Sequence, residues 1–208
     1  MSWPHILSLS RIVAGPVVAA LILGPRGDAY LIAAVLFTLA SVTDLLDGKL
    51  ARYSQRVSPL GVFLDTTSDK VLVSLVLVAL AVSGLAAAWI PLVIIGREFL
   101  ISGLRSFAAS SNRIISAHAW GKGKAAITMA AIPLLLAAAD GRYGGVLAPL
   151  GDSTFWHDAE LATSGLLILA AILTVISGVR YLVDALPLFR PHALEPPADD
   201  KRVAAGGR

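Results

Sequence analysis

The sequence has no cysteine among its 208 residues, which excludes disulfide bonds and thiolate chemistry. Charge is also scarce: Asp, Glu, Lys and Arg make up 15% of the chain, against roughly 25% in a typical soluble domain. Aromatic residues reach only 7% and the net charge is +3, so the aromatic and basic face typical of nucleic-acid binding is missing. Because 56% of the residues are hydrophobic, these shortages indicate a small polytopic membrane protein.

The apolar residues form six long blocks, which predict an all-α protein with six transmembrane helices. At a rise of about 1.5 Å per residue, a helix of roughly 20 residues crosses a hydrocarbon core of about 30 Å. The blocks cover residues 8–24, 29–50, 61–83, 86–108, 122–139 and 161–186. Residues 140–160 contain Gly and Pro and are predicted to form an external loop between the last two helices.

Basic residues distinguish the two sides of the membrane. Arg11, Arg52, Arg113 and Lys122 all fall on one side of the predicted membrane. The opposite loops hold only Arg26 and Arg142, beside several acidic residues. Because basic loops remain in the cytoplasm, we expect a multi-pass protein of the inner or plasma membrane with both termini cytoplasmic. Residues 1–186 are predicted to form one membrane domain, and residues 187–208, with several prolines and a polar end, a disordered cytoplasmic tail.

Four aspartates lie in the second and third blocks, where an ionised Asp costs at least about 2.5–3.5 kcal/mol. They are Asp44, Asp47, Asp65 and Asp69. The members of each pair are three or four residues apart, so each pair shares one face of a helix. Two such faces opposed would form a cluster of hard oxygen ligands that suits Mg²⁺ or Mn²⁺, and a metal pair there could hold a diphosphate.

Small and basic residues accompany the aspartates. Gly48 and Ala51 follow the first pair and leave a groove where a ligand can approach the backbone closely. Arg52 can meet a phosphate with its planar guanidinium. Gly61 begins the next block, four residues before the second pair. Together with the aspartates these residues fix eight positions within 26 residues, which favours a site for a phosphate-bearing ligand.

Other interpretations of the aspartates are a proton relay, a helix cap, and ion pairs with Arg52 and Lys70. A cation- or proton-coupled transporter would need acidic residues along a full transmembrane path, but these cluster near the cytoplasmic ends of two adjacent blocks. It would also leave Gly48 and Ala51 unexplained. We therefore favour an enzyme and keep the transporter as the alternative of a different class.

The chain resembles the CDP-alcohol phosphotransferase family, whose signature is matched at every position by Asp44-x2-Asp47-Gly48-x2-Ala51-Arg52-x8-Gly61-x3-Asp65-x3-Asp69. The resemblance implies a six-helix membrane fold, usually a homodimer, with the nucleotide bound at the cytoplasmic face. It implies that the four aspartates hold two metal ions, Mg²⁺ or Mn²⁺, and that Asp69 is also the general base. The residues implied to bind the CDP moiety of CDP-diacylglycerol are Gly48, Ala51, Arg52 and Gly61.

Three further segments resemble the branch of this family whose acceptor is glycerol 3-phosphate. They are Arg97-Glu98-x3-Ser102-x2-Arg105, Gly121-Lys122-Gly123-Lys124 and Ser177-Gly178-x2-Tyr181. An acceptor that carries its own phosphate needs a cluster of cations beyond those that balance the carboxylates. The candidate phosphate-binding residues are Arg97, Arg105, Lys122, Lys124 and Arg180. Arg97 could instead pair with Glu98 or extend toward the membrane interface.

The resemblance thus implies transfer of a phosphatidyl group from CDP-diacylglycerol to glycerol 3-phosphate, which forms phosphatidylglycerophosphate and CMP in phospholipid biosynthesis. The lipid chains are expected to stay in the bilayer while the headgroup enters the polar site. The nearest alternative is the same transfer to phosphatidylglycerol, serine or inositol phosphate.

Overall fold

The structure, a computed structural model, describes residues 3–24, 29–53, 59–110 and 120–186. Within these ranges it does not describe the side chains of residues 3–8, 44–53, 59–66, 120–122 and 124. All regular structure in the described residues is helical, which confirms the all-α class. The elements are α1 (Trp3–Leu23), α2 (Ala29–Tyr53), α3 (Pro59–Val82), α4 (Trp89–Ser110), α5 (Trp120–Arg142), the 3₁₀ helix η1 (Ala148–Leu150) and α6 (Ser153–Ala185).

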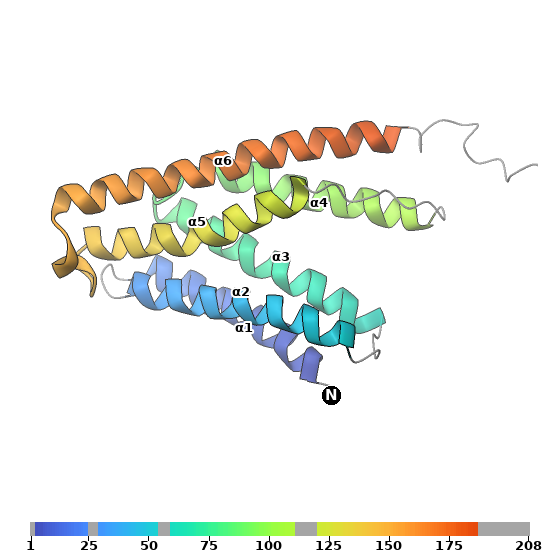
Figure 1. Cartoon of the computed structure of the whole chain (residues 1–208), viewed down its shortest axis with the longest axis horizontal. Helices are drawn as coiled ribbons and strands as arrows, with labels where there is room; N and C mark the ends of the chain where they lie inside the picture. Colours follow the sequence, from blue (N-terminus) through green and yellow to red (C-terminus); the bar gives the residue numbers. More distant parts are fainter. Residues whose placement is uncertain (1–2, 25–28, 54–58, 111–119, 187–208) are drawn as a thin grey trace, which may run out of the picture.

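The helices run alternately in opposite directions (Figure 1). The end of α2 and the start of α3 lie at one end of the bundle, together with the end of α4 and the start of α5. We call this the motif end, because it carries the Asp-rich sequence, and call the opposite end the far end. The connections described at the far end are short, and Gly84, with φ of 83°, allows the chain to turn between α3 and α4.

The predicted blocks match the observed helices to within three residues, except at the start of the first and of the last: α1 begins at Trp3 rather than at residue 8, and α6 begins before residue 161. Residues 140–160 were predicted to be a loop, but α5 continues to Arg142 and α6 begins at Ser153. The early start has a local cause, because the Asp152 side chain caps α6 by accepting a hydrogen bond of 2.7 Å from the Phe155 N–H. The prediction of a continuous external loop was therefore wrong, and much of the segment is helical.

Two helical segments among the described residues are long and apolar enough to cross a membrane. They are Ala125–Arg142 and Ser153–Ala185, and shorter apolar stretches cover Leu9–Leu23 and Ala29–Thr43. Many large apolar side chains of α6 face outward, among them Ile172, Val175 and Val179, each about half exposed. The structure therefore supports membrane association through apolar helices.

The interior of the bundle is apolar and centred on α1, α2, α3 and α5. Gly15 of α1 lies against α3 so closely that an added Cβ would be 3.4 Å from the Leu72 Cα and 3.0 Å from the Leu75 Cδ1. Small residues allow such close approach of helices. Fully buried members of the core include Val18, Ile22, Phe37, Leu72, Leu80, Ile132 and Leu135. This contact fixes α3, and with it the position of its aspartates, against the first helix.

A buried carboxylate holds together the helices at the far end of the bundle. Asp140, near the end of α5, is fully buried and accepts hydrogen bonds from the backbone N–H of Leu31 at 3.3 Å and of Leu147 at 2.9 Å. Gly145 lies directly against it, since a Cβ there would come within 2.2 Å of the Asp140 Oδ1. A single side chain thus joins the start of α2, the end of α5 and the loop that leads to α6.

Candidate active site

The motif aspartates lie on the two helices that approach the motif end. Asp44 and Asp47 are in α2, and Asp65 and Asp69 are in α3, with helical backbone throughout both segments. The helical spacing assumed for each pair is therefore confirmed. The motif residues whose side chains lie outside the described part are Asp44, Asp47, Gly48, Ala51, Arg52, Gly61 and Asp65. Their assembly into one cluster stays a prediction.

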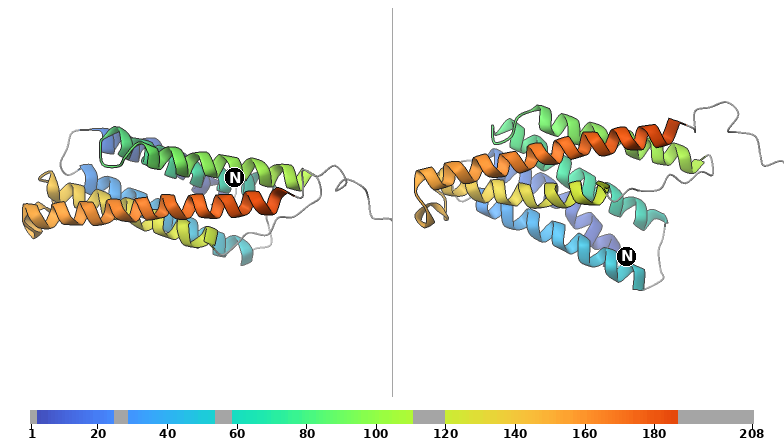
Figure 2. Two further views of the ribbon diagram at one scale, coloured as in Figure 1. Left: turned by 90° about the horizontal axis from the view of Figure 1, so that it is seen from above. Right: turned by 45° about the horizontal axis from the view of Figure 1, so that its top comes forward.

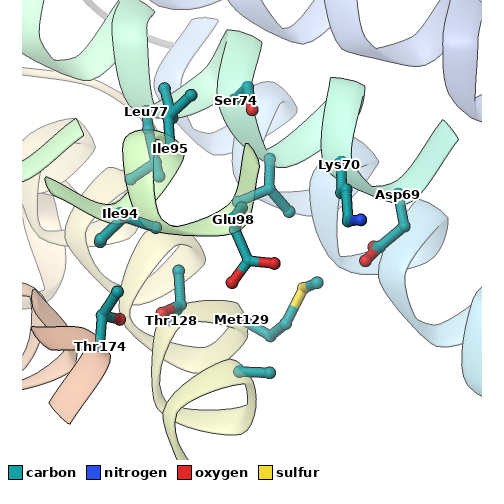
Figure 3. Close-up of a pocket in the computed structure, with 12 residues that line it drawn as sticks. Asp69, Lys70, Ser74, Leu77, Ile94, Ile95, Glu98, Thr128, Met129 and Thr174 are labelled. Carbon is teal, nitrogen blue, oxygen red and sulfur yellow. The ribbon is translucent and has the colours of Figure 1, made fainter. Parts of the chain in front are cut away.

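Asp69 is the motif residue whose side chain the structure describes, and this side chain lines a cavity. The cavity has a volume of about 90 Å³ and lies between α3, α4, α5 and α6. Most of its wall is apolar, but Asp69 and Lys70 of α3 and Glu98 of α4 face the same space (Figure 3). The remaining polar lining residues are Ser74, Thr128 and Thr174. An ionisable trio in an apolar bundle is costly, which indicates a binding site for a polar ligand.

Lys70 is fixed at the cavity by a bond across two helices. Its Nζ donates a hydrogen bond to the Ser102 Oγ of α4. The Ser102 hydroxyl in turn donates to the backbone carbonyl of Glu98, at 2.6 Å. This chain ties α3 to α4 beside the cavity and holds the Lys70 ammonium in a defined place.

Arg97 joins α4 to α6 beside the same cavity. Its Nη1 donates to the Glu98 Oε1 at 3.2 Å, and its Nη2 donates to the Ser177 Oγ at 3.3 Å. The stem of Arg97 lies over Gly178, where an added Cβ would come within 3.0 Å of the Arg97 Cγ. The Ser-Gly pair of the last helix thus accommodates Arg97, and Figure 2 shows α6 running beside both α4 and α5.

The other candidate phosphate-binding cations lie nearer the motif end. Arg105 is eight residues beyond Arg97 on α4, and Arg180 follows Ser177 on α6; both side chains are exposed. Lys122 and Lys124 belong to the first turns of α5, and their side chains lie outside the described part. The fold brings these positions to one end on three neighbouring helices, while their joint role in binding stays a prediction.

Sequence reasoning missed two features of this region. Glu98 entered only as a possible partner of Arg97, although its carboxylate faces the cavity. Arg11 was used only for membrane orientation, yet it is 1% exposed and its Nη1 lies 3.5 Å from the Oγ of the buried Ser68, next to Asp69. A signal for Arg11 was present, because an ionisable residue inside an apolar block indicates function or a buried partner.

Of the four predicted metal ligands, Asp69 is the one whose side chain the structure describes. Among the side chains that the structure describes, no group of three or more acidic, His or Cys residues gathers. Asp69 nevertheless fits a divalent cation, because it offers a half-buried carboxylate, a hard oxygen ligand, at the edge of a polar cavity. The three other predicted ligands lie outside the part in which side chains are described.

Comparison with known proteins gives a consistent result. A sequence model of the CDP-alcohol phosphatidyltransferase family matches residues 1–177. CDP-diacylglycerol–glycerol-3-phosphate 3-phosphatidyltransferase of Bacillus subtilis is 34% identical, with 86% of this chain and 92% of the relative covered. The protein of the same name in Pseudomonas fluorescens is 33% identical, with 90% and 91% covered. An Arabidopsis thaliana relative, numbered 2 under that name, is 31% identical over 79% of this chain and 76% of its own.

Proposed function

Since this chain belongs to the CDP-alcohol phosphatidyltransferase family, we propose that it is a phosphatidylglycerophosphate synthase. It transfers the phosphatidyl group of CDP-diacylglycerol to glycerol 3-phosphate in phospholipid biosynthesis. The observation that carries the proposal is the position of Asp69. The side chain of this motif residue lines a cavity that is also lined by Lys70 and Glu98. A base, a cation and a second carboxylate in an apolar bundle suit a small, charged, hydroxylated acceptor.

Divalent metal ions are generally used by this family, and we propose two, Mg²⁺ or Mn²⁺, held by Asp44, Asp47, Asp65 and Asp69. The donor set consists of carboxylate oxygens, which those ions prefer. When bound, such ions draw charge from the diphosphate of the donor lipid. Gly48, Ala51, Arg52 and Gly61 would hold the CDP moiety: the small residues admit it close to the backbone and Arg52 meets a phosphate.

Asp69 is proposed as the general base. It accepts the proton of the primary hydroxyl of glycerol 3-phosphate as that oxygen bonds to the phosphorus next to diacylglycerol. The bond from this phosphorus to the oxygen shared with the cytidylyl phosphate breaks, and CMP leaves with the electron pair. Positioning and charge balance supply most of the catalysis in such transfers. The phosphate of the acceptor is assigned to the cations Arg97, Arg105, Lys122, Lys124 and Arg180.

The reaction assignment is tested by CMP release from CDP-diacylglycerol with a panel of acceptors. Purified protein is offered glycerol 3-phosphate, glycerol, serine, inositol phosphate and phosphatidylglycerol in turn. We expect glycerol 3-phosphate to give the fastest release. A faster rate with another acceptor would replace the acceptor assignment but keep phosphatidyl transfer. No release with any acceptor would contradict the enzyme assignment and favour the transporter.

We further propose that all six helices span the membrane, with both termini and the site at the cytoplasmic face. The alternating directions of the helices support this arrangement, and so does their length, since the shortest has 21 residues. Basic residues gather at the motif end, as expected for the cytoplasmic side. By family resemblance the protein is a homodimer, surrounded by membrane lipids.

Single-cysteine labelling tests the orientation, because the native chain has no cysteine to interfere. In intact cells, Val146→Cys in the far-end loop should react with an impermeant maleimide, whereas Ser116→Cys should react only after permeabilisation. The Val146 side chain is 57% exposed, so its labelling depends on the side of the membrane rather than on burial. Labelling of position 116 in intact cells would reverse the orientation.

A further inference from the structure

Arg11 and Asp140 are the two charged side chains that are fully buried in the part of the chain that the structure describes, at 1% and 0% exposed. Asp140 has a structural role at the far end, whereas the mechanism above assigns none to Arg11 of α1. An arginine on a membrane helix can usually extend its charge toward water, and burying that charge is costly. The burial of Arg11 therefore indicates a task inside the bundle.

Arg11 belongs to a set of contacts that fix α3 against α1. Its Nη1 donates a hydrogen bond of 3.5 Å to the Oγ of Ser68, which is also fully buried. One turn further along both helices, Gly15 lies against Leu72, where an added Cβ would be 3.4 Å from the Leu72 Cα. The two contacts are four residues apart on each helix, so they are successive contacts between helices that run in the same direction (Figure 1). Together they set the position of α3 along and around its own axis.

The sequence of α3 shows why such contacts matter. From Val71 to Val82 the helix is apolar except at Ser74. A helix that is apolar on all sides has no polar face that would oppose its rotation about its own axis. The polar contacts just before this segment, at Ser68 and Lys70, therefore decide which way the helix faces.

Asp69 lies between two residues that are bonded to different helices. Ser68 accepts a hydrogen bond from Arg11 of α1, and Lys70 donates one to Ser102 of α4. Consecutive positions on a helix differ by about 100° around its axis, so these bonds hold the same turn from two directions. Between them, the Asp69 side chain lines the cavity.

A small rotation of α3 would displace the Asp69 carboxylate by a distance that matters for catalysis. The ends of side chains lie roughly 5–6 Å from a helix axis, so a rotation of about 10° moves them by about 1 Å. A functional group needs its position held to about 0.5 Å, and a misplacement of about 1 Å can lower a rate about a hundredfold. Contacts that prevent this rotation therefore affect catalysis without touching the substrate.

We propose that Arg11 is a positioning residue, which acts through Ser68 to hold the Asp69 carboxylate toward its metal ion and the acceptor. This inference rests on the proposed function, because it concerns the site of that reaction. Arg11 itself contacts neither substrate in this arrangement. Its loss should therefore lower metal affinity and turnover together, and should leave the KM of both substrates nearly unchanged.

The test measures Mn²⁺ binding, by electron paramagnetic resonance, and CMP release in the full-length protein in detergent. Both values are expressed per folded molecule after size-exclusion chromatography. We expect Arg11→Met to weaken Mn²⁺ binding about tenfold and to lower kcat about tenfold to a hundredfold, with each KM within about threefold. Loss of a positive charge near a metal ion would by itself tighten binding. Weaker binding therefore reports a displaced carboxylate.

Two further variants separate geometry from charge. Arg11→Lys keeps the charge but loses the planar fork, so it should also weaken Mn²⁺ binding, by about threefold to tenfold. Ser68→Ala should change affinity and kcat in the same direction as Arg11→Met. Adding Ser68→Ala to Arg11→Met should cause little further loss, because both changes break the same contact.

Asp140→Asn is the matched control, because it also removes a fully buried charge, but at the far end. It should reduce thermal stability and leave Mn²⁺ affinity and kcat per folded molecule unchanged. Tighter Mn²⁺ binding by Arg11→Met would overturn the inference, and so would unchanged affinity and kcat or a rise in one KM alone. Where Arg11→Met fails to fold, Arg11→Lys and Ser68→Ala decide by the same measurements. If the unaltered protein itself binds no Mn²⁺ or releases no CMP, the proposed function fails and the inference with it, which is a separate result.

Discussion

Replacement of Asp69 by Asn is expected to lower the rate of CMP release by about a hundredfold to ten-thousandfold while the protein remains folded. The amide keeps the size of the side chain but cannot accept the proton of the attacking hydroxyl, and a positioned base contributes a factor of that order. It also removes one negative charge from the proposed metal site. Asn at Asp44, Asp47 or Asp65 should cause losses of similar size through the metals. The rates are measured with saturating substrates in detergent.

Metal binding by the four Asp→Asn variants can be measured separately from their activity. Binding of Mn²⁺, followed by electron paramagnetic resonance, should weaken in all four variants, and EDTA should abolish activity that Mg²⁺ or Mn²⁺ then restores. Asp158→Asn is the control, because Asp158 is an exposed carboxylate near the start of α6 at the far end. Full activity in the presence of chelator would contradict the metal proposal, and full activity of Asp69→Asn would remove the base from the mechanism.

Replacement of Arg105 by Ala should raise the KM for glycerol 3-phosphate about tenfold or more. A charge-assisted hydrogen bond contributes roughly 1.5–3 kcal/mol, and about 1.4 kcal/mol corresponds to a factor of ten. The KM for CDP-diacylglycerol should change little, because Arg105 is assigned to the acceptor phosphate and not to the CDP moiety. Arg105→Lys should recover only part of the loss, since an ammonium lacks the planar fork of arginine.

Two further variants make the result specific. Arg52→Ala should have the reverse effect, with a higher KM for CDP-diacylglycerol and little change for the acceptor. Arg142→Ala, which removes a cation at the far end, should alter neither value. Equal effects of Arg105→Ala on both substrates would show that Arg105 supports the fold rather than the acceptor phosphate.

Patterns within a single helix could be predicted from the sequence, because they depend only on local spacing. The apolar blocks located all six helices, and the helical spacing of Asp44 with Asp47 and of Asp65 with Asp69 follows from the backbone of α2 and α3. The start of α6 was missed because the Asp152 side chain caps a helix that begins at Ser153. Eight residues that were expected to form a loop are therefore helical. A polar, Gly-containing segment gave no apolar signal to reveal that helix.

Contacts between distant segments could not be predicted in this way. Glu98 looked like a simple partner of its neighbour Arg97, and only the packing of α4 against α6 and beside α3 shows that it borders a cavity with Asp69. Arg11 is buried with its Nη1 3.5 Å from the Oγ of Ser68, which is 57 residues away along the chain. The role of Gly178 could not be predicted either, because the sequence of an apolar helix does not show that the Arg97 side chain lies over this glycine.

The buried Asp140 gives the two ends of the protein different tolerances to genetic change. Because it fastens α2, α5 and the following loop at the far end, substitutions there act on the amount of folded protein that a cell accumulates. On the proposed function, substitutions at the motif end act instead on the turnover of each molecule. On that same assignment, residues around the cavity can therefore change the activity while the scaffold at the far end is retained.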